Sequence, residues 1–234
     1  MALELEGVRW LFFDLGYTLI NEDAAAMGRL SQASDALKQR GIDASTDKLH
    51  DALEAASARF DPSPFGNVLQ AFTDDEDVIA FVRSSGRYPK ELEAPYPQAQ
   101  RLLARLEGRY QLGIIANQPP GTAERLQAYG LSGYFEVCVS SGDIGISKPD
   151  AAIFHLALEQ AECAPGDAVM VGDRLDNDIR PAKSARLPHG ANPSGARTVA
   201  AASVRMGRRR TPRLRIWTNL QPCSMLMLAG DEAD

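Results

Sequence analysis

Cysteine, histidine and long apolar runs are all scarce in this sequence. The 234 residues include three cysteines, Cys138, Cys163 and Cys223, and three histidines, all widely spaced. An odd number of scattered cysteines argues against a disulfide framework, and neither residue type has the spacing of a zinc site. No apolar run approaches the ~20 residues that a membrane-spanning helix needs. We therefore expect a soluble globular protein with reduced thiols and no membrane partner. The start, MALELEGVRW, lacks the basic and apolar segments of a signal peptide, so we expect a cytoplasmic location.

Acidic residues are missing from one long stretch near the C-terminal end. Residues 184 to 230 contain eight arginines but no lysine, aspartate or glutamate. Such a segment can contact nucleic acid, here through Arg208, Arg209, Arg210, Arg213 and Arg215. Trp217 is the only aromatic residue after Phe154, so the aromatic interleaving of a nucleic-acid site is missing and we do not expect nucleic acid as a partner. An alternative explanation is that part of the stretch is frame-altered, because a shifted frame in a GC-rich gene encodes Arg-, Ala-, Pro- and Gly-rich sequence.

Continuous apolar runs predict strands that are buried on both faces of a parallel sheet. VRWLFFDL (8–15) and YQLGIIAN (110–117) are the first two such runs. After residue 117 the pattern alternates, with a helix near 120–130, EVCVSS at 136–141, a helix near 150–162, DAVMVGD at 167–173 and a helix near 178–186. This alternation predicts an α/β fold, a doubly wound, Rossmann-like parallel sheet with right-handed crossovers.

Helical patterning fills the interval between the first two predicted strands. It covers 27–41, 45–60, 68–86 and 96–108, with Ser45 as an N-cap and glycines closing three of the segments. DPSPFGN (61–67) is typical of a Pro/Gly loop. We therefore expect a core formed by residues 1–20 and 96–234, of which 186–234 is an atypical tail, and a helical cap formed by residues 21–95.

Polar residues stand at or after the predicted strand ends. Asp14, Asn117 and Asp173 follow three strands, Asp178 comes five residues later, and Lys148 lies in ISKPD. Ligands of open parallel sheets bind beyond the carboxyl ends of the strands, so we expect these side chains around one crevice. Neighbouring carboxylates repel one another unless a cation neutralises them, and their hard oxygen atoms suit Mg²⁺. A lysine there would hold phosphate, and a carboxylate that faces phosphorus is a competent nucleophile.

Taken in order, FDLGYTL, IIAN, SKPD and VGDRLDND resemble the four motifs of the haloacid dehalogenase-like hydrolase superfamily. The helical insertion resembles the cap of the subgroup that includes phosphoglycolate phosphatase-like enzymes, and the resemblance covers residues 8 to about 185. It implies a Mg²⁺-dependent phosphatase that hydrolyses a small phosphorylated metabolite through an aspartyl-phosphate intermediate. In relatives a further strand and helix follow the fourth motif, so we expect a strand in GARTVAAASV and a last strand and helix in LRIWTNLQPCSMLML.

The resemblance also implies a role for each matching residue. The nucleophile would be Asp14, and Lys148 would contact the phosphoryl group as a second catalytic residue. Asn117 matches the asparagine that follows the hydroxyl residue of the second motif and is a candidate phosphate-binding residue. The candidate metal site comprises Asp14, the backbone carbonyl of Gly16, Asp173, and Asp178 as a supporting residue.

Three positions depart from the superfamily pattern. Gly16 replaces the usual second aspartate, the general acid that protonates the leaving group and then activates water. Such a group is typically worth about 100- to 10,000-fold in rate. Ala116 stands where a Ser or Thr usually bonds the phosphate, and Tyr17 replaces a usual glycine, which reshapes the turn or brings its hydroxyl into the site.

Gly16 leaves three interpretations open. The enzyme could hydrolyse substrates with good leaving groups, such as acyl or anomeric phosphates, or obtain its acid from elsewhere. It could belong to the carbon–halogen or carbon–phosphorus branches of the superfamily. A dehalogenase needs no metal, so the acidic motif GDRLDND argues against the first branch. A phosphonate hydrolase needs a cap lysine, for which Lys38, Lys48 and Lys90 are the candidates. It could also be a catalytically impaired binding or regulatory protein. We favour the phosphatase.

Overall fold

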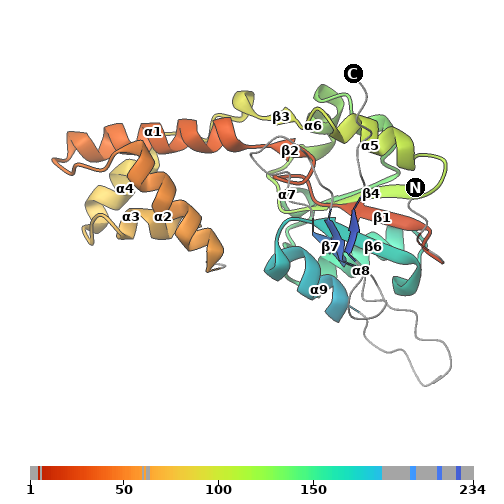
Figure 1. Cartoon of the computed structure of the whole chain (residues 1–234). Helices are drawn as coiled ribbons and strands as arrows, with labels where there is room; N and C mark the ends of the chain where they lie inside the picture. Colours follow the sequence, from red (N-terminus) through yellow and green to blue (C-terminus); the bar gives the residue numbers. More distant parts are fainter. Residues whose placement is uncertain are drawn as a thin grey trace. The chain divides into compact units, whose positions relative to one another are not determined.

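The computed structural model describes residues 5, 7–59, 61, 64–185, 201–203, 215–217 and 225–227. The chain divides into two compact units. Met1–Asn21 and Pro95–Asp234 form the first, which we call the core unit, and Glu22–Ala94 form the second, the helical unit (Figure 1).

The core unit contains a five-stranded sheet whose strands run in the order β5-β4-β1-β6-β7. Figure 1 labels four of them, β4, β1, β6 and β7. Every described pairing in the sheet is parallel. The strands are β1 (Trp10–Phe13), β4 (Gln111–Ala116), β5 (Val137–Ser140), β6 (Ala168–Gly172) and β7 (Ala201–Ser203). Strands that are distant in sequence lie side by side because helices connect them, so the predicted doubly wound α/β fold is confirmed.

Both faces of the sheet are buried, which explains the continuous apolar runs. Along β1, Leu11 and Phe13 contribute to one hydrophobic cluster, and Trp10 and Phe12 contribute to another. Successive strand residues point to opposite faces, so a strand covered on both sides must be apolar at every position. The first cluster receives residues from α5 (Ala99–Leu106) and α6 (Thr122–Ala128), and the second from α8 (Ala151–Gln160) and α9 (Arg180–Ser184).

Shorter elements complete the core unit. A four-residue helix, α7 (Ser141–Ile144), follows β5, and a π-helical segment at Leu175–Ile179 leads into α9. β2 (Ile20–Asn21) pairs with β3 (Ala94–Pro95) where the chain leaves and re-enters the core unit. None of the helices in the described part of the chain is long and apolar enough to cross a membrane.

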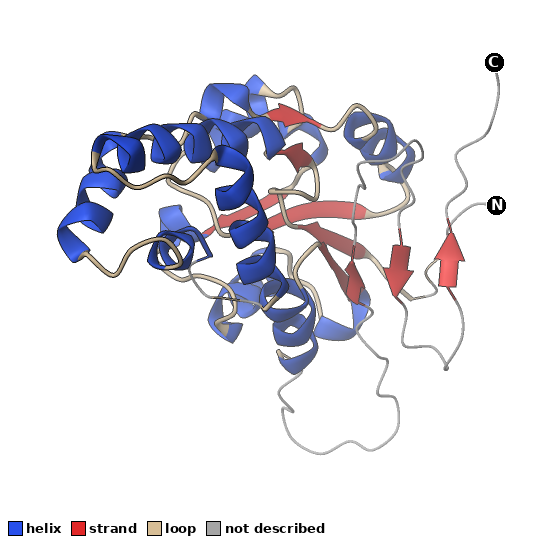
Figure 2. Ribbon diagram, turned by 60° about the vertical axis from the view of Figure 1, so that its left-hand side comes forward, coloured by secondary structure: helices blue, strands red, loops and turns tan. Residues whose placement is uncertain are grey.

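The helical unit consists of α1 (Asp23–Gln39), α2 (Thr46–Ala58), α3 (Pro64–Gln70) and α4 (Glu76–Ser85), joined by loops (Figure 2). The side chain of Ser45 accepts a hydrogen bond from the amide of Lys48, so the predicted N-cap is confirmed. The predicted helical segment at 68–86 is wrong in one respect: it is broken after Gln70, and Asp75 caps a new helix through its carboxylate. Part of the predicted 61–67 loop is helical, because Pro64 occupies a first-turn position, where its missing N–H costs nothing.

The tail contributes short strands. β7 lies within GARTVAAASV, where a strand was predicted, and it pairs with β6. β8 (Arg215–Trp217) pairs antiparallel with β9 (Met225–Met227), so the helix expected near the end of LRIWTNLQPCSMLML is wrong at these residues. A short apolar run fits a strand as well as a helix, and periodicity does not separate them. Four of the five arginines considered for nucleic acid, Arg208, Arg209, Arg210 and Arg213, lie outside the described residues.

Candidate active site

Three carboxylates meet at the carboxyl edge of the sheet. Asp14 follows β1, Asp173 follows β6, and Asp178 lies in the π-helical segment after it. One carboxylate oxygen from each lies within 4.8 Å of the others. Neighbouring parallel strands end at the same edge, and this places Asp14 beside residues that follow it by more than 150 positions. Asp14 is held by its own amide, which donates to the carbonyl of Val171 at 2.8 Å.

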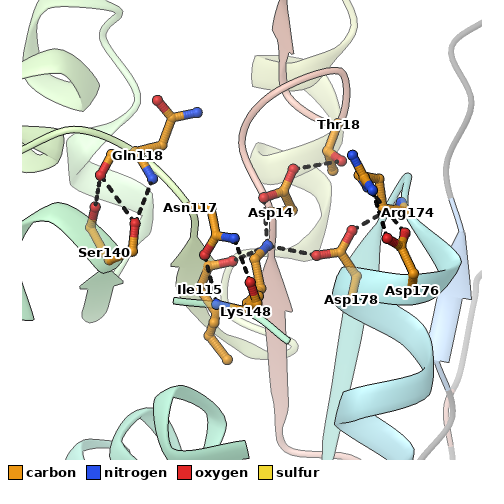
Figure 3. A network of polar contacts seen from close by, with 11 residues as sticks. Asp14, Thr18, Ile115, Asn117, Gln118, Ser140, Lys148, Arg174, Asp176 and Asp178 are labelled. Atoms are coloured by element: carbon orange, nitrogen blue, oxygen red, sulfur yellow. Dashed lines mark hydrogen bonds and ion pairs between the residues drawn. The ribbon is translucent and has the colours of Figure 1, made fainter. Parts of the chain in front are cut away.

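A buried lysine ammonium lies between the carboxylates of Asp14 and Asp178 (Figure 3). Lys148 Nζ is 2.7 Å from Asp14 Oδ1 and 2.6 Å from Asp178 Oδ1, and it donates a third hydrogen bond to the carbonyl of Ile115 at 2.9 Å. An ammonium group has three donors, so all three are used. Thr18 Oγ1 donates to the other oxygen of Asp14 at 3.3 Å. The nucleophile candidate is therefore bonded at both oxygen atoms.

Burial and the neighbouring negative charges both disfavour the ionised forms of two carboxylates in the cluster. Burial, together with the negative charges of Asp14 and Asp178, raises the pKa of Asp173 to about 8. Burial and the charge of Asp14 raise the pKa of Asp178 to about 6 against the opposing influence of Lys148. Burial alone would lower the pKa of Lys148, but Asp14 and Asp178 outweigh it and the pKa is raised. The lysine thus stays charged, while Asp173 holds a proton near neutral pH in the absence of a cation.

Backbone groups around the fourth motif hold Asp178 in place. The amide of Arg174 donates to Asp178 Oδ2 at 3.0 Å, and the Arg174 side chain pairs with Asp176 instead (Figure 3). Gly172, the last residue of β6, makes room for the carboxylate: a Cβ atom built there would lie 2.4 Å from Asp178 Cγ. Sequence reasoning missed the contributions of Gly172 and of the Ile115 carbonyl. The glycine of VGD was the available signal for the first, whereas a backbone carbonyl leaves none.

The three departures from the superfamily pattern all lie on the same edge. Gly16 is half-buried and forms a single bridge to Ile20, and its backbone does not have a positive φ. Tyr17 does, at φ 54°, and its side chain is 36% exposed. Ala116, which stands where the superfamily usually has Ser or Thr, is fully buried in the first hydrophobic cluster.

Asn117 lies at the same edge, after β4, but both ends of its amide contact Lys148. Its Oδ1 accepts from the Lys148 amide at 2.7 Å and its Nδ2 donates to the Lys148 carbonyl at 2.8 Å. Asp14, Lys148, Asp173 and Asp178 are thus brought together, whereas Asn117 adjoins the backbone of the lysine. The arrangement offers oxygen ligands for a hard cation, a fixed positive charge and a carboxylate at the sheet edge.

Comparison with known proteins identifies the family of this chain. The sequence profile of haloacid dehalogenase-like hydrolases matches residues 8–186. The chain belongs to that family. The resemblance seen in the four motifs is thereby confirmed, and the site lies at the motif residues of a haloacid dehalogenase-like hydrolase.

Individual relatives of this chain include enzymes named as phosphatases and a nucleotidase. Pyrimidine 5'-nucleotidase YjjG from Escherichia coli is 30% identical over 175 residues, which cover 74% of this chain and 72% of that protein. Phosphoserine phosphatase from Thermus thermophilus is 38% identical over 108 residues, but these cover only 45% of this chain and 41% of the relative. Among solved structures, a HAD phosphatase from Thermococcus onnurineus has a TM-score of 0.57 at 26% identity and covers 87% of this chain and 89% of its own.

Proposed function

We propose that this hydrolase is a Mg²⁺-dependent phosphatase for a small phosphorylated metabolite, with Asp14 as nucleophile. The main support is the cluster of Asp14, Asp173 and Asp178. The buried ammonium of Lys148 forms ion pairs with two of these carboxylates. The relatives support phosphate chemistry without naming one substrate, since they include a phosphoserine phosphatase, a pyrimidine 5'-nucleotidase and glyceraldehyde 3-phosphate phosphatases.

The chemistry of the cluster fits a hard divalent cation. Its ligand atoms are carboxylate oxygens, and three carboxylates share one ammonium, while burial together with the neighbouring carboxylates raises the pKa values of Asp173 and Asp178. Asp14, Asp173 and the backbone carbonyl of Gly16 would hold Mg²⁺, and Asp178 would support them. The bound ion would supply positive charge to the phosphate oxygens.

The residues of the chain then account for the transfer. A carboxylate oxygen of Asp14 attacks phosphorus, the bond from phosphorus to the leaving oxygen breaks, and that oxygen takes the electron pair, which gives an aspartyl-phosphate. Lys148 balances the negative charge on the phosphoryl oxygens during the transfer. Water then attacks phosphorus and gives up a proton to solvent, the bond from phosphorus to the Asp14 oxygen breaks, and its electron pair returns to the carboxylate as orthophosphate leaves. We also propose that the helical unit acts as the cap that selects the substrate.

Gly16 determines which substrates react well. Without an acid beside Asp14, the leaving oxygen departs as an anion or takes its proton from solvent, so turnover favours leaving groups of low pKa. Acetyl phosphate, sugar-1-phosphates and p-nitrophenyl phosphate should react faster than alkyl phosphates. Aspartate at position 16 should reverse much of this bias. Because Gly16 lacks a positive φ, the substitution introduces no left-handed strain.

The test is hydrolysis of those four substrate types with and without Mg²⁺ by the wild type, Asp14→Asn and Gly16→Asp. We expect Mg²⁺-dependent turnover that Asp14→Asn abolishes, and about 100-fold or greater gains on alkyl phosphates in Gly16→Asp. A wild type that is inert on every substrate, with no gain in Gly16→Asp, would sink the proposal. The absent acid and the alanine at position 116 would then favour a binding or regulatory protein.

A further inference from the structure

One side-chain amide binds both backbone polar groups of the candidate catalytic lysine. Asn117 follows β4, and Lys148 lies in the loop between α7 and α8. The two hydrogen bonds, at 2.7 and 2.8 Å, form a closed pair (Figure 3). The backbone of Lys148 fixes the orientation of this amide, because an N–H group can only donate and a carbonyl oxygen can only accept. Asn117 therefore pairs with Lys148 much as an adjacent strand would.

The end of β4 also bonds the side-chain ammonium of Lys148, in addition to its backbone. The carbonyl of Ile115, two residues before Asn117, accepts from the ammonium at 2.9 Å. The remaining two donors of the ammonium are bonded to Asp14 and Asp178. The segment around Lys148 has no helix or strand of its own, so these side-chain and carbonyl contacts substitute for regular secondary structure.

We propose that Asn117 is a positioning residue that holds Lys148 against Asp14, and that it is not a ligand of the phosphoryl group. Its acceptor and one of its donors are committed to the lysine backbone. Loss of the pair frees the loop, and the ammonium then leaves the carboxylates for part of the time. The structural part of this inference stands on contacts alone, while its kinetic part rests on the proposed phosphatase function.

The first test needs no turnover. The chain has five lysines, and Lys38, Lys48, Lys90 and Lys183 are exposed, so in ¹⁵N-lysine-labelled protein only the Lys148 ammonium should exchange slowly enough to give a sharp ¹H–¹⁵N signal. Lys148→Met assigns that signal. Asn117→Ala should remove or broaden it. Gln111→Ala should leave it unchanged, because that residue bonds Glu136 at the other end of β4.

Asn117→Asp guards against misfolding of the alanine variant. It keeps the acceptor for the Lys148 amide and loses the donor to its carbonyl, so the signal should persist with faster hydrogen exchange. A wild-type signal with unchanged exchange in both Asn117 variants would overturn the positioning role, whether or not the protein is a phosphatase.

The second test separates positioning from phosphate contact. Loss of two hydrogen bonds should lower kcat about 10- to 100-fold in Asn117→Ala with little change in KM. The same substitution should cost nothing further in a Lys148→Met background, because the effect passes through the lysine. A raised KM, weaker inhibition by orthophosphate and an unchanged penalty in the Lys148→Met background would instead identify a phosphate ligand and overturn the proposal. If the wild type proves inert, the ammonium signal alone decides.

Discussion

Replacement of Lys148 by methionine should strongly destabilise the protein in the absence of divalent cations. Methionine fills a similar volume, but it removes the one cation that bonds Asp14 and Asp178 among the described residues; the side chains of these two aspartates are 12% and 1% exposed. Removal of one partner from a buried ion pair costs ~3–5 kcal/mol. With a urea slope near 2 kcal/mol/M, the unfolding midpoint should fall by roughly 1.5–2.5 M.

The pH dependence of this loss follows from the same contacts. Lys148 lowers the pKa values of Asp173 and Asp178, so its removal raises both further. A carboxyl group whose pKa is raised by folding stabilises the fold below its unfolded pKa and loses that contribution as the pH rises through the folded value. The defect should therefore be small near pH 5 and largest at pH 8. Mg²⁺ at 100 times its Kd should return ~2.7 kcal/mol.

Urea unfolding followed by circular dichroism, at pH 5 and pH 8 and with or without Mg²⁺, measures all of these effects. Lys183→Met is the matched control, because Lys183 is exposed on α9 in the same unit. If the midpoints of Lys148→Met and the wild type coincide at pH 8 without Mg²⁺, the ammonium does not neutralise the cluster. The electrostatic account of the site would then be wrong.

Two further predictions follow from single residues. Because the pKa of Asp173 is raised to about 8 from an ordinary 3.8, the metal-free wild type should lose stability between pH 6 and pH 8. Asp173→Asn should reduce this dependence of stability on pH. Urea midpoints measured between pH 6 and pH 8 test this, and an equally steep pH dependence in the variant would contradict it. Because Tyr17 has φ 54°, Tyr17→Gly should be about 1 kcal/mol more stable than Tyr17→Ala, since both lack the ring and only alanine keeps the left-handed strain. Equal thermal midpoints for these two variants would show that the turn relaxes.

The fold was predictable because continuous apolar runs indicate the buried strands, and capped, helically patterned segments indicate the helices between them. A strand such as Trp10–Phe13 is buried on both faces and is therefore apolar throughout, and Ser45 is a local helix signal. The break between α3 and α4 was not predicted. Phe72 and Val78 give apolar spacing across it, and the Asp75 cap that restarts the helix lies within an acidic run that also suits a helix surface.

The candidate site was predictable in its side chains and less so in its connections. Strand ends and motif order indicated Asp14, Lys148, Asp173 and Asp178, whose roles remain predictions. No sequence pattern indicates that the Asn117 side chain bonds the backbone of Lys148. A hydrogen bond between two loops depends on their relative placement, and that emerges only when the sheet has assembled.

The position of the Asp178 carboxylate depends on the absence of a side chain at Gly172. Any side chain at this position would begin 2.4 Å from the carboxyl carbon of Asp178 and would displace it, although every ionisable group of the site would still be present. An alanine there is thus a means of moving one carboxylate without deleting it, which a substitution of the aspartate itself never achieves. The Gly172→Ala variant would keep every acidic and basic residue of the site, but the distance from Asp178 to Lys148 would change.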